Sequence, residues 1–234
     1  MSKMGESGEV LSYLEMCQRE GVNLQRGMNF RLRGGMSVIL MSVRTGAPYE
    51  DEIVDEGKTL IYEGHDVARS SNCPDPKALD QPLFNPNGSL TQNGLFFRAA
   101  EQCKRGELSA ELVRVYEKIK SGIWVYNGLF RLTEGVQESS NGRQVFKFRL
   151  TLLDDAEETP APDHPDLGHD RLIPTAVKLA VWTRDKGRCV KCGSTDNLHF
   201  DHIIPYSKGG SSLVAENIQL LCARHNLEKR DKIE

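Results

Sequence analysis

The chain has 234 residues and a net charge of −3, and 38% of its residues are hydrophobic while 27% are charged. These values are ordinary for a soluble globular protein, and the length allows two modest domains, each with a core of its own. The apolar runs are too short to span a bilayer, and the polar start of the chain does not contain the apolar core of a signal peptide. We therefore expect a cytoplasmic protein that does not enter the membrane.

The negative charge is concentrated in one segment. Residues 154–170 contain seven acidic residues, no Lys or Arg, and several prolines. Such a segment cannot bury enough apolar surface to order itself, so it predicts a flexible linker between a domain at 1–153 and a domain at 171–234. The rest of the chain is net basic once this segment is set aside, so the overall charge does not exclude a nucleic-acid partner.

The first domain is expected to be mostly β-structure. Helical spacing of apolar residues predicts helices over 8–20, 94–105 and 108–120, the last with Ser109 as its N-cap. Strands are expected over 36–43, 59–62, 122–132 and 144–153. Asn141-Gly142 is a hairpin signal ahead of the last strand, whereas 72–94 is rich in Pro, Asn, Asp and Gly and predicts a loop.

The second domain has a mixed pattern. A helix is predicted over 174–185 with Pro174 at its start, and a short strand over 199–204. A loop and the start of a strand are expected over 213–221, followed by a basic helix over 224–232. The fold class expected for the whole chain is therefore α+β, in two domains.

Two pairs of possible metal ligands frame the second domain. Cys189 and Cys192 form a Cys-x-x-Cys pair, and Cys222 and His225 form a Cys-x-x-His pair. Three thiolates and one imidazole are a common ligand set for structural, tetrahedral zinc. This spacing predicts a zinc site that holds the two ends of the domain together.

Further polar residues lie between and beside these pairs, in the order Asp201-His202-Ile-Ile-Pro205, Gly209-Gly210, Asn217 and Asn226. With the zinc pairs, they make residues 171–233 resemble the HNH endonuclease family, whose fold is a ββα-metal unit. The resemblance implies that His202 is the general base, that Asp201 and Asn226 hold a catalytic divalent ion, and that Asn217 braces the loop and orients the histidine. Oxygen ligands suit Mg²⁺ or Mn²⁺, and phosphodiester hydrolysis needs both a base and positive charge.

Two alternatives stay open for this domain. Many relatives end in Cys-x-x-Cys-His, so we interpret His225 as the fourth zinc ligand and Asn226 as the replacement for the terminal histidine. In a competing interpretation His225 is catalytic and zinc keeps three ligands. A zinc ribbon that only binds DNA would explain the cysteines and His225, but not the set Asp201, His202 and Asn217.

The first domain carries a second resemblance, spread over short motifs at Gly46-Ala-Pro-Tyr49, Ile61-Tyr62-Glu-Gly64, Asp80-Gln81-Pro82-Leu83, Asn93-Gly94-Leu95 and Trp124-Val-Tyr126-Asn127-Gly128. Their order over residues 33–153 resembles the SRA (SET- and RING-associated) domain, which often has Tyr-Asp-Gly at the last motif. The resemblance implies a PUA-like β-barrel that flips a modified cytosine out of duplex DNA.

A pocket for a flipped base needs aromatic faces and a carboxylate that accepts from the cytosine amino group. The resemblance puts Tyr49 and Tyr62 at the stacking positions and Glu52 at the acidic position, where the family commonly has Asp. Asp51 is a substitute candidate for the carboxylate, and backbone around Gly64 would complete the pocket edge. In the alternative, these tyrosines only pack and the acidic residues form a solvated loop.

Arginines near the pocket are candidate DNA contacts. Arg69 lies in the loop where family members insert a finger into the gap left by the flipped base. Arg31 and Arg33 could contact phosphates, although ordinary surface arginines are the alternative in each case.

Together these patterns predict a modification-dependent (type IV-like) restriction endonuclease acting on double-stranded DNA with 5-methylcytosine or 5-hydroxymethylcytosine. Structural Zn²⁺ and catalytic Mg²⁺ or Mn²⁺ are its expected metals. One centre cuts one strand, which suggests a homodimer, and the linker would set the cutting distance. The rival predictions are an HNH nicking or homing-type nuclease that reads unmodified sequence, and a zinc-stabilised DNA-binding module without activity.

Overall fold

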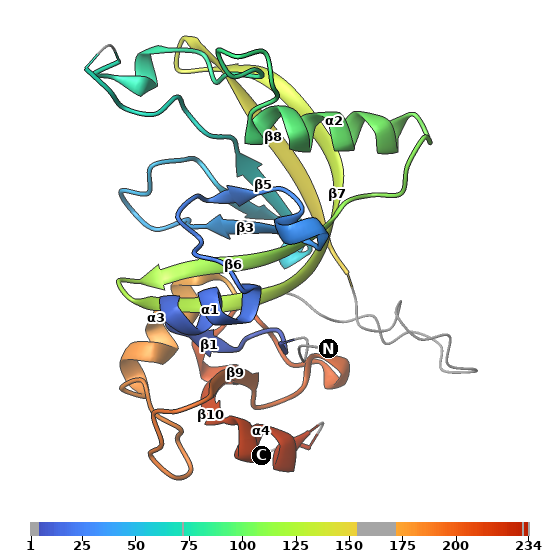
Figure 1. Cartoon of the computed structure of the whole chain (residues 1–234). Helices are drawn as coiled ribbons and strands as arrows, with labels where there is room; N and C mark the ends of the chain where they lie inside the picture. Colours follow the sequence, from blue (N-terminus) through green and yellow to red (C-terminus); the bar gives the residue numbers. More distant parts are fainter. Residues whose placement is uncertain (1–4, 72, 154–171, 231, 234) are drawn as a thin grey trace.

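The computed structural model describes residues 5–71, 73–153, 172–230 and 232–233. Its larger part is built on one curved sheet, drawn from blue to yellow in Figure 1. The strands of this sheet are β1 (Val10–Leu11), β2 (Met28–Asn29), β3 (Ser37–Met41), β4 (Glu52–Val54), β5 (Thr59–Glu63), β6 (Leu112–Lys120), β7 (Ile123–Ser140) and β8 (Arg143–Leu152). Their order is β2-β3-β6-β7-β8-β5-β4, with β1 beside β7. The β3–β6 pairing is parallel and the other described pairings in this sheet are antiparallel.

Helices α1 (Tyr13–Glu20) and α2 (Gln92–Lys104) cover parts of this sheet. A capping box formed by Ser12 and Glu15 begins α1, and Gly21 ends it with a φ of 67°. The helix predicted from residue 8 therefore starts later, because Val10 and Leu11 pair with β7 instead. Helix α2 agrees with its prediction and packs against β7 and β8, where Phe96 is fully buried.

The predicted helix over 108–120 is wrong, because most of this segment forms strand β6. Val113, Val115 and Ile119 alternate in the segment, and β-branched residues at a period of two favour a strand. The strand lies in the sheet interior between β3 and β7, so its backbone is paired on both sides. Tertiary pairing here outweighs the helical propensity of the intervening charged residues.

The hairpin predicted at Asn141-Gly142 is confirmed. The two residues have φ values of 50° and 79° and join β7 to β8, which pair along their length. Positive φ at both turn positions matches the twist of antiparallel strands and is tolerated best by Asn and Gly. Gly64, by contrast, lies in a crowded interior, where an added Cβ would lie within 2.9 Å of Gln81, Asn93 and Phe146.

The smaller, C-terminal unit contains a two-stranded sheet, with one helix before it and one helix after it in the sequence. Its elements are α3 (Thr175–Arg184), β9 (Leu198–His202), β10 (Ile218–Cys222) and α4 (Ala223–Lys229). Strands β9 and β10 are antiparallel, with Asp201 opposite Gln219. Both helices contact β10, so this unit has the ββα arrangement expected from the sequence.

The two units are packed against each other. A single buried cluster contains Ile119 and Val125 of the large sheet together with Val181, Phe200 and Leu220 of the smaller unit. The predicted linker, 154–170, falls outside the described residues, but Leu172, which follows it, is buried in the core of the larger unit. The two units are therefore in direct contact through a shared core, in addition to their connection along the chain. In the described part of the chain, no helix is both long and apolar enough to cross a bilayer.

Candidate functional site

Four possible metal ligands converge where β10 meets α4. The ligand atoms of Cys189, Cys192, Cys222 and His225 all lie within 4.8 Å of one another. Nδ1 of His225 is 3.3 Å from Sγ of Cys189 and 3.4 Å from Sγ of Cys222, and Sγ of Cys192 is 3.9 Å from Sγ of Cys222. Thiolates about 2.3 Å from a tetrahedral zinc ion are separated by about 3.8 Å, so this cluster fits such an ion.

The electrostatics of the cluster favour metal binding. Burial by itself would raise the pKa of the Cys189 thiol, but backbone amides of Cys222, Cys192 and Lys191 lower that pKa to about 6. The thiolate is the form that binds zinc, and a thiol with this pKa is ionised near neutral pH. The four residues therefore form a site suited to a metal such as zinc, and His225 belongs to it.

Asp201 and His202, two of the predicted nuclease residues, are the last two residues of β9, at the opposite end of the strand from Leu198, which pairs with Cys222. Oδ2 of Asp201 is 3.1 Å from Nζ of Lys229, a lysine of α4 that is 1% exposed. The same ammonium donates to the carbonyl of His202 at 2.6 Å, and Gln219 donates to Asp201 at 3.3 Å. Lys229 thus contacts both residues of the Asp-His pair.

The imidazole of His202 is largely buried. Its Nε2 lies 2.8 Å from the hydroxyl of Ser212. Burial, and secondarily the charge of Lys229, lower the pKa of His202 to about 4. The ring is therefore neutral at neutral pH, which is the state required of a general base.

Asn217 holds the loop that follows β9. Its Oδ1 accepts from the amide of Ile204 at 2.8 Å, and its Nδ2 donates to the carbonyls of Ile204 and Ser211 at 3.0 Å each. Gly210 lies in the same loop, and a Cβ on it would be 1.8 Å from the Ile204 carbonyl oxygen. The loop that carries Ser212 toward His202 is thus fixed by one amide side chain and one close backbone approach.

Asn226 lies on α4, and its Nδ2 donates to Glu6 at 3.3 Å. Glu6 is also 3.9 Å from Nδ1 of His199 on β9. The sequence offered no signal for Glu6, because it is far from this unit in the chain. The N-terminal segment therefore reaches the edge of the predicted catalytic centre.

A cavity of about 670 Å³ opens in the larger unit, and it brings together several predicted pocket residues. Tyr49, Asp51 and Tyr62 line it, together with His65. Tyr62 is 1% exposed, whereas Tyr49 is half-buried. Gly64 is not among the lining residues; its carbonyl accepts from Gln81 at 2.7 Å behind the cavity.

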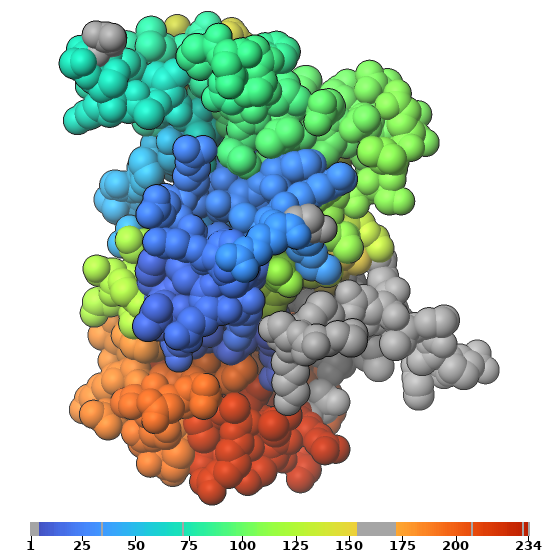
Figure 2. All heavy atoms as spheres, viewed as in Figure 1, coloured from blue at the N-terminus to red at the C-terminus, as the bar shows by residue number. Residues whose placement is uncertain are grey.

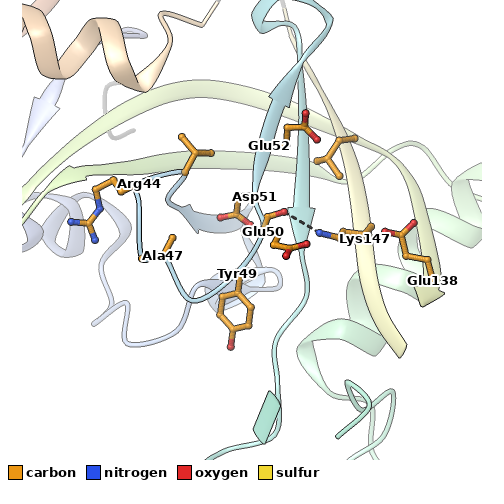
Figure 3. Close-up of a pocket in the computed structure, with 11 residues that line it drawn as sticks. Arg44, Ala47, Tyr49, Glu50, Asp51, Glu52, Glu138 and Lys147 are labelled. Carbon is orange, nitrogen blue, oxygen red and sulfur yellow. Dashed lines mark hydrogen bonds between the residues drawn. The ribbon is translucent and has the colours of Figure 1, made fainter. Parts of the chain in front are cut away.

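The two candidate carboxylates differ in position. Asp51 lies inside the cavity, where its two oxygens accept from the amides of Ser42 at 3.0 Å and Glu63 at 3.1 Å. Burial raises the pKa of Asp51 to about 7, although these two amides lower it. Glu52 is exposed at the start of β4 and is directed away from Tyr49 in Figure 3. It lines a neighbouring cleft of about 560 Å³, which Tyr49 and Asp51 also line. The structure thus places Asp51, not Glu52, beside the aromatic rings.

His65 is a cavity residue that the sequence did not single out. Its ring stacks on Tyr49 with a centroid distance of 5.3 Å and an interplanar angle of 20°, and its Nε2 is 3.1 Å from the hydroxyl of Tyr62. Burial lowers the pKa of His65 to about 4, so the stacked ring is neutral. In the sequence, its position directly after the Tyr62-Glu-Gly64 motif could have indicated that it belongs to the pocket.

The predicted DNA-contacting arginines are distributed differently. Arg69 is exposed in the loop after β5, and Arg33 is exposed near β3. Arg31 is engaged by Glu111, with Nη2 at 2.8 Å from the carboxylate, and lines a different cleft. Arg26 and Arg44, which the sequence did not indicate, line the cavity itself.

Comparisons with known proteins agree with this division of the chain. The family model described as SAD/SRA domain matches residues 6–156, and the model described as HNH endonuclease matches residues 189–232. No curated protein matches the chain.

Several solved structures resemble the chain. One is SUVH5 SRA in a complex with hemi-methylated CG DNA, at 25% identity and a TM-score of 0.45, covering 70% of this chain and 94% of that one. Another is SUVH5 SRA bound to fully hydroxymethylated CG DNA, at 24% identity and a TM-score of 0.46, covering 71% and 96%. A third is Arabidopsis thaliana SUVH6 in complex with SAM, at 22% identity and a TM-score of 0.42, covering 86% and 32%.

Proposed function

Because the chain belongs to the SAD/SRA domain family and carries an HNH endonuclease region at its C-terminal end, we propose that it is a modification-dependent DNA endonuclease. The observation that carries the proposal is the presence of two sites in one packed molecule. One is an aromatic cavity lined by the carboxylate of Asp51, and the other is a histidine-aspartate pair in a unit that also carries a metal-ligand cluster. The first site suits recognition of a base, and the second suits hydrolysis.

Recognition uses a cytosine that is flipped out of the duplex into the cavity. The ring of Tyr49 supplies a stacking face, and Asp51 accepts a hydrogen bond from the exocyclic amino group of the base. Each Asp51 oxygen already accepts one backbone amide and keeps a second lone pair for the base. The preferred modifications are 5-methylcytosine or 5-hydroxymethylcytosine.

Arg26 and Arg44 line the cavity, and we propose them as contacts for the phosphates next to the flipped nucleotide. Arg69, on its exposed loop, is the candidate for the side chain that enters the gap left in the duplex. Arg33 is exposed at a second point on the same unit, whereas Arg31 is paired with Glu111 through Nε and Nη2 and has only its remaining N–H donors for a phosphate.

Hydrolysis is assigned to the C-terminal unit. His202 takes a proton from the attacking water at Nδ1, in the tautomer in which Nε2–H donates to the Ser212 hydroxyl. Asp201 and Asn226 would hold a Mg²⁺ or Mn²⁺ ion, which supplies positive charge for the transition state and the leaving oxygen. Asn217 keeps the loop and Ser212 in place, and the cysteine-histidine cluster would hold structural zinc.

One centre of this kind cuts one strand. We propose that a double-strand break requires two chains, either as a homodimer on DNA or in successive events. A duplex with one modified cytosine separates these cases, because a dimer cuts both strands with kinetics that depend on the square of the protein concentration.

The test uses matched duplexes that are unmodified, 5-methylcytosine-containing or 5-hydroxymethylcytosine-containing, incubated with Mg²⁺ or Mn²⁺. Cleavage confined to modified DNA, and reduced by about 10²–10⁴-fold in His202→Ala with DNA binding intact, is the expected result. Equal cutting of all three duplexes would contradict the proposal that the protein reads a modification, and it would indicate a nuclease that reads ordinary sequence. Binding without cutting under either metal would identify a DNA-binding module instead.

A further inference from the structure

The N-terminal segment hydrogen-bonds to both units at once. The amide of Gly8 donates to the carbonyl of Tyr126 on β7 at 2.9 Å, and the carbonyl of Gly8 accepts from the amide of Phe200 on β9 at 2.9 Å. Glu9 forms an antiparallel bridge with His199, and β1 continues along β7. This strand therefore lies between the large sheet and the small one, as the position of β1 in Figure 1 shows.

The contact at Gly8 requires glycine. Its φ is 87°, and an added Cβ would lie 2.7 Å from the carbonyl oxygen of Phe200. A side chain at this position would be strained in the left-handed region and would also push β9 away from the N-terminal strand. The two sheets are thus held at a separation that any larger residue would increase.

An apolar core fills the space next to this strand. It combines residues of β6 and β7 with residues of α3, β9 and β10, namely Ile119, Val125, Ile173, Val177, Val181, Phe200, Ile218 and Leu220. The space-filling view shows the C-terminal unit, in orange and red, directly against the lower part of the larger unit. Figure 2 and the cluster agree that the contact is continuous packing and not a loose tether.

A polar network is buried inside the same interface. Nζ of Lys178, on α3, lies 2.6 Å from Oε2 of Glu117 on β6 and 2.7 Å from Oδ1 of Asn127 on β7. Asn127 donates to Glu117 at 3.0 Å, and the hydroxyl of Thr175 donates to the other Glu117 oxygen. Glu117 is 0% exposed and Lys178 is 1% exposed.

This network selects one orientation of the two units. Burial alone would raise the pKa of Glu117, but Lys178, Thr175 and Asn127 together hold it below its usual value. A buried charge is tolerated only while its partners stay in place, so a rotation or slide of α3 on the sheet would leave both charges unpaired. Apolar contacts would allow α3 to slide along the sheet. The donors and acceptors of this network, in contrast, can all be paired in only one position of α3.

Leu153 and Leu172, the described residues on either side of segment 154–171, are also attached to the larger unit. The amide of Leu153 donates to the carbonyl of Leu129 at 2.8 Å, and the amide of Leu172 donates to the carbonyl of Gly57 at 3.1 Å. The chain thus leaves and returns to the same sheet before α3 begins. Leu172, three residues before α3, is therefore fixed to the larger unit.

We propose that this interface, with Gly8 and Lys178 as positioning residues, sets the place of cleavage relative to the flipped base. The inference rests on the proposed function, because it takes the cavity as the reader and the His202 centre as the cutter. The reader and the cutter then move as one body, and the strand is cut at a distance that the interface dictates. The length of the segment between Leu153 and Leu172 has no influence on that distance.

The first test lengthens this segment in the full chain. A Gly/Ser insertion that doubles the stretch between Leu153 and Leu172 increases the reach of any tethered domain. Cleavage is mapped on an end-labelled duplex with one modified cytosine. The expected result is cutting at the same phosphodiester bonds as the unaltered protein, and cut positions that spread outward with the insertion would overturn the proposal.

The second test loosens the interface without changing the connector. Lys178→Met leaves Glu117 buried without its cation, and we expect new cut positions on both sides of the original ones. Adding Glu117→Gln removes the unpaired carboxylate, so the range of cut positions should become narrow again. A local effect of Lys178→Met on catalysis alone would not be reversed in this way. Lys186→Met, at an exposed lysine near the end of α3, is the matched control and should keep the original pattern. An unchanged pattern in Lys178→Met would count against the inference.

A readout without cleavage separates this inference from the proposed function. Hydrogen exchange at the amide of Phe200, which is bonded to Gly8, should stay slow in the insertion variant and become fast in Gly8→Val. If the unaltered protein does not cut any duplex, the proposed function fails while this exchange pattern still decides whether the units are docked. Fast exchange after insertion alone would show that the connector holds them together, contrary to the proposal.

Discussion

Nζ of Lys229 lies 3.1 Å from Oδ2 of Asp201, and the lysine is 1% exposed. This pair fixes α4 against the end of β9, where Asp201 and His202 are the last two residues of the strand. Because the same ammonium also donates to the carbonyl of His202, a single side chain controls the position of both residues.

Replacing Lys229 with Met should therefore reduce both stability and cleavage. The side chain keeps its length, but the carboxylate of Asp201 loses its buried counter-charge, which should lower the free energy of unfolding by about 2–4 kcal/mol. Urea unfolding measures this change. Lys232→Met, at an exposed position, is the control and should stay within about 0.5 kcal/mol of the unaltered protein. Equal effects of the two substitutions would show that the Lys229 pair has no structural weight.

Metal analysis should find about one zinc ion per chain, bound by the cluster around His225. Cys189→Ser should bring the zinc content close to zero and lower the melting temperature, because metal binding is coupled to folding of the C-terminal unit. Cys103→Ser removes a thiol outside the cluster and should leave both values unchanged. Retention of a full zinc equivalent in Cys189→Ser would contradict the assigned ligand set.

Binding of modified DNA should weaken as the pH falls through neutrality. Burial raises the pKa of Asp51 to about 7, so the carboxylate that accepts from cytosine is charged at pH 8 and mostly protonated at pH 6. Fluorescence anisotropy at the two pH values measures this loss, and Asp51→Asn should remove the pH dependence. If Glu52→Gln, and not Asp51→Asn, weakened binding at pH 8, the exposed carboxylate would be the contact, as the resemblance first implied.

The same group should change stability in the opposite direction. A pKa raised on folding means that the folded protein holds a proton that the unfolded chain has released. Its contribution to stability is therefore fully present below the ordinary pKa of Asp, and it is lost as the pH rises through about 7. His65 and His202, whose pKa values are lowered to about 4, give the opposite trend below about pH 6.5. The Asp51 contribution is therefore measured as the melting temperature of the DNA-free protein minus that of Asp51→Asn, and this difference should fall as the pH rises from 5 to 8.

Tyr49→Ala should weaken binding of the modified duplex by about 1–3 kcal/mol, the usual contribution of one aromatic stacking partner. Tyr49→Phe keeps the ring and loses only a hydroxyl whose contact with the Asp66 amide is long, at 3.4 Å, so it should bind nearly as well as the unaltered protein. Affinity for unmodified DNA, which does not use the cavity, serves as the internal reference. A parallel loss of both affinities in Tyr49→Ala would indicate a structural role for this tyrosine.

Local signals predicted many elements of the fold correctly. The turn at Asn141-Gly142, helix α2 and the ββα order of the C-terminal unit all follow from short-range spacing and capping. The helix expected over 108–120 failed because the pairing of β6 with two distant strands outweighs its local propensity. Similarly, adjacent Asp51 and Glu52 cannot be ranked by spacing, since only the path of β4 decides which side chain enters the cavity.

The order of residues was enough to predict the candidate sites: a Cys/His set for a metal, an Asp-His pair with nearby asparagines, and aromatic and acidic residues in the order of one family. These predictions depend on residue type and short spacing along the chain. How the two sites are related in space could be read only from the folded protein. The strand at Gly8 and the buried Lys178–Glu117 pair join residues far apart in the chain, and such contacts form only when folding closes the long loops between them.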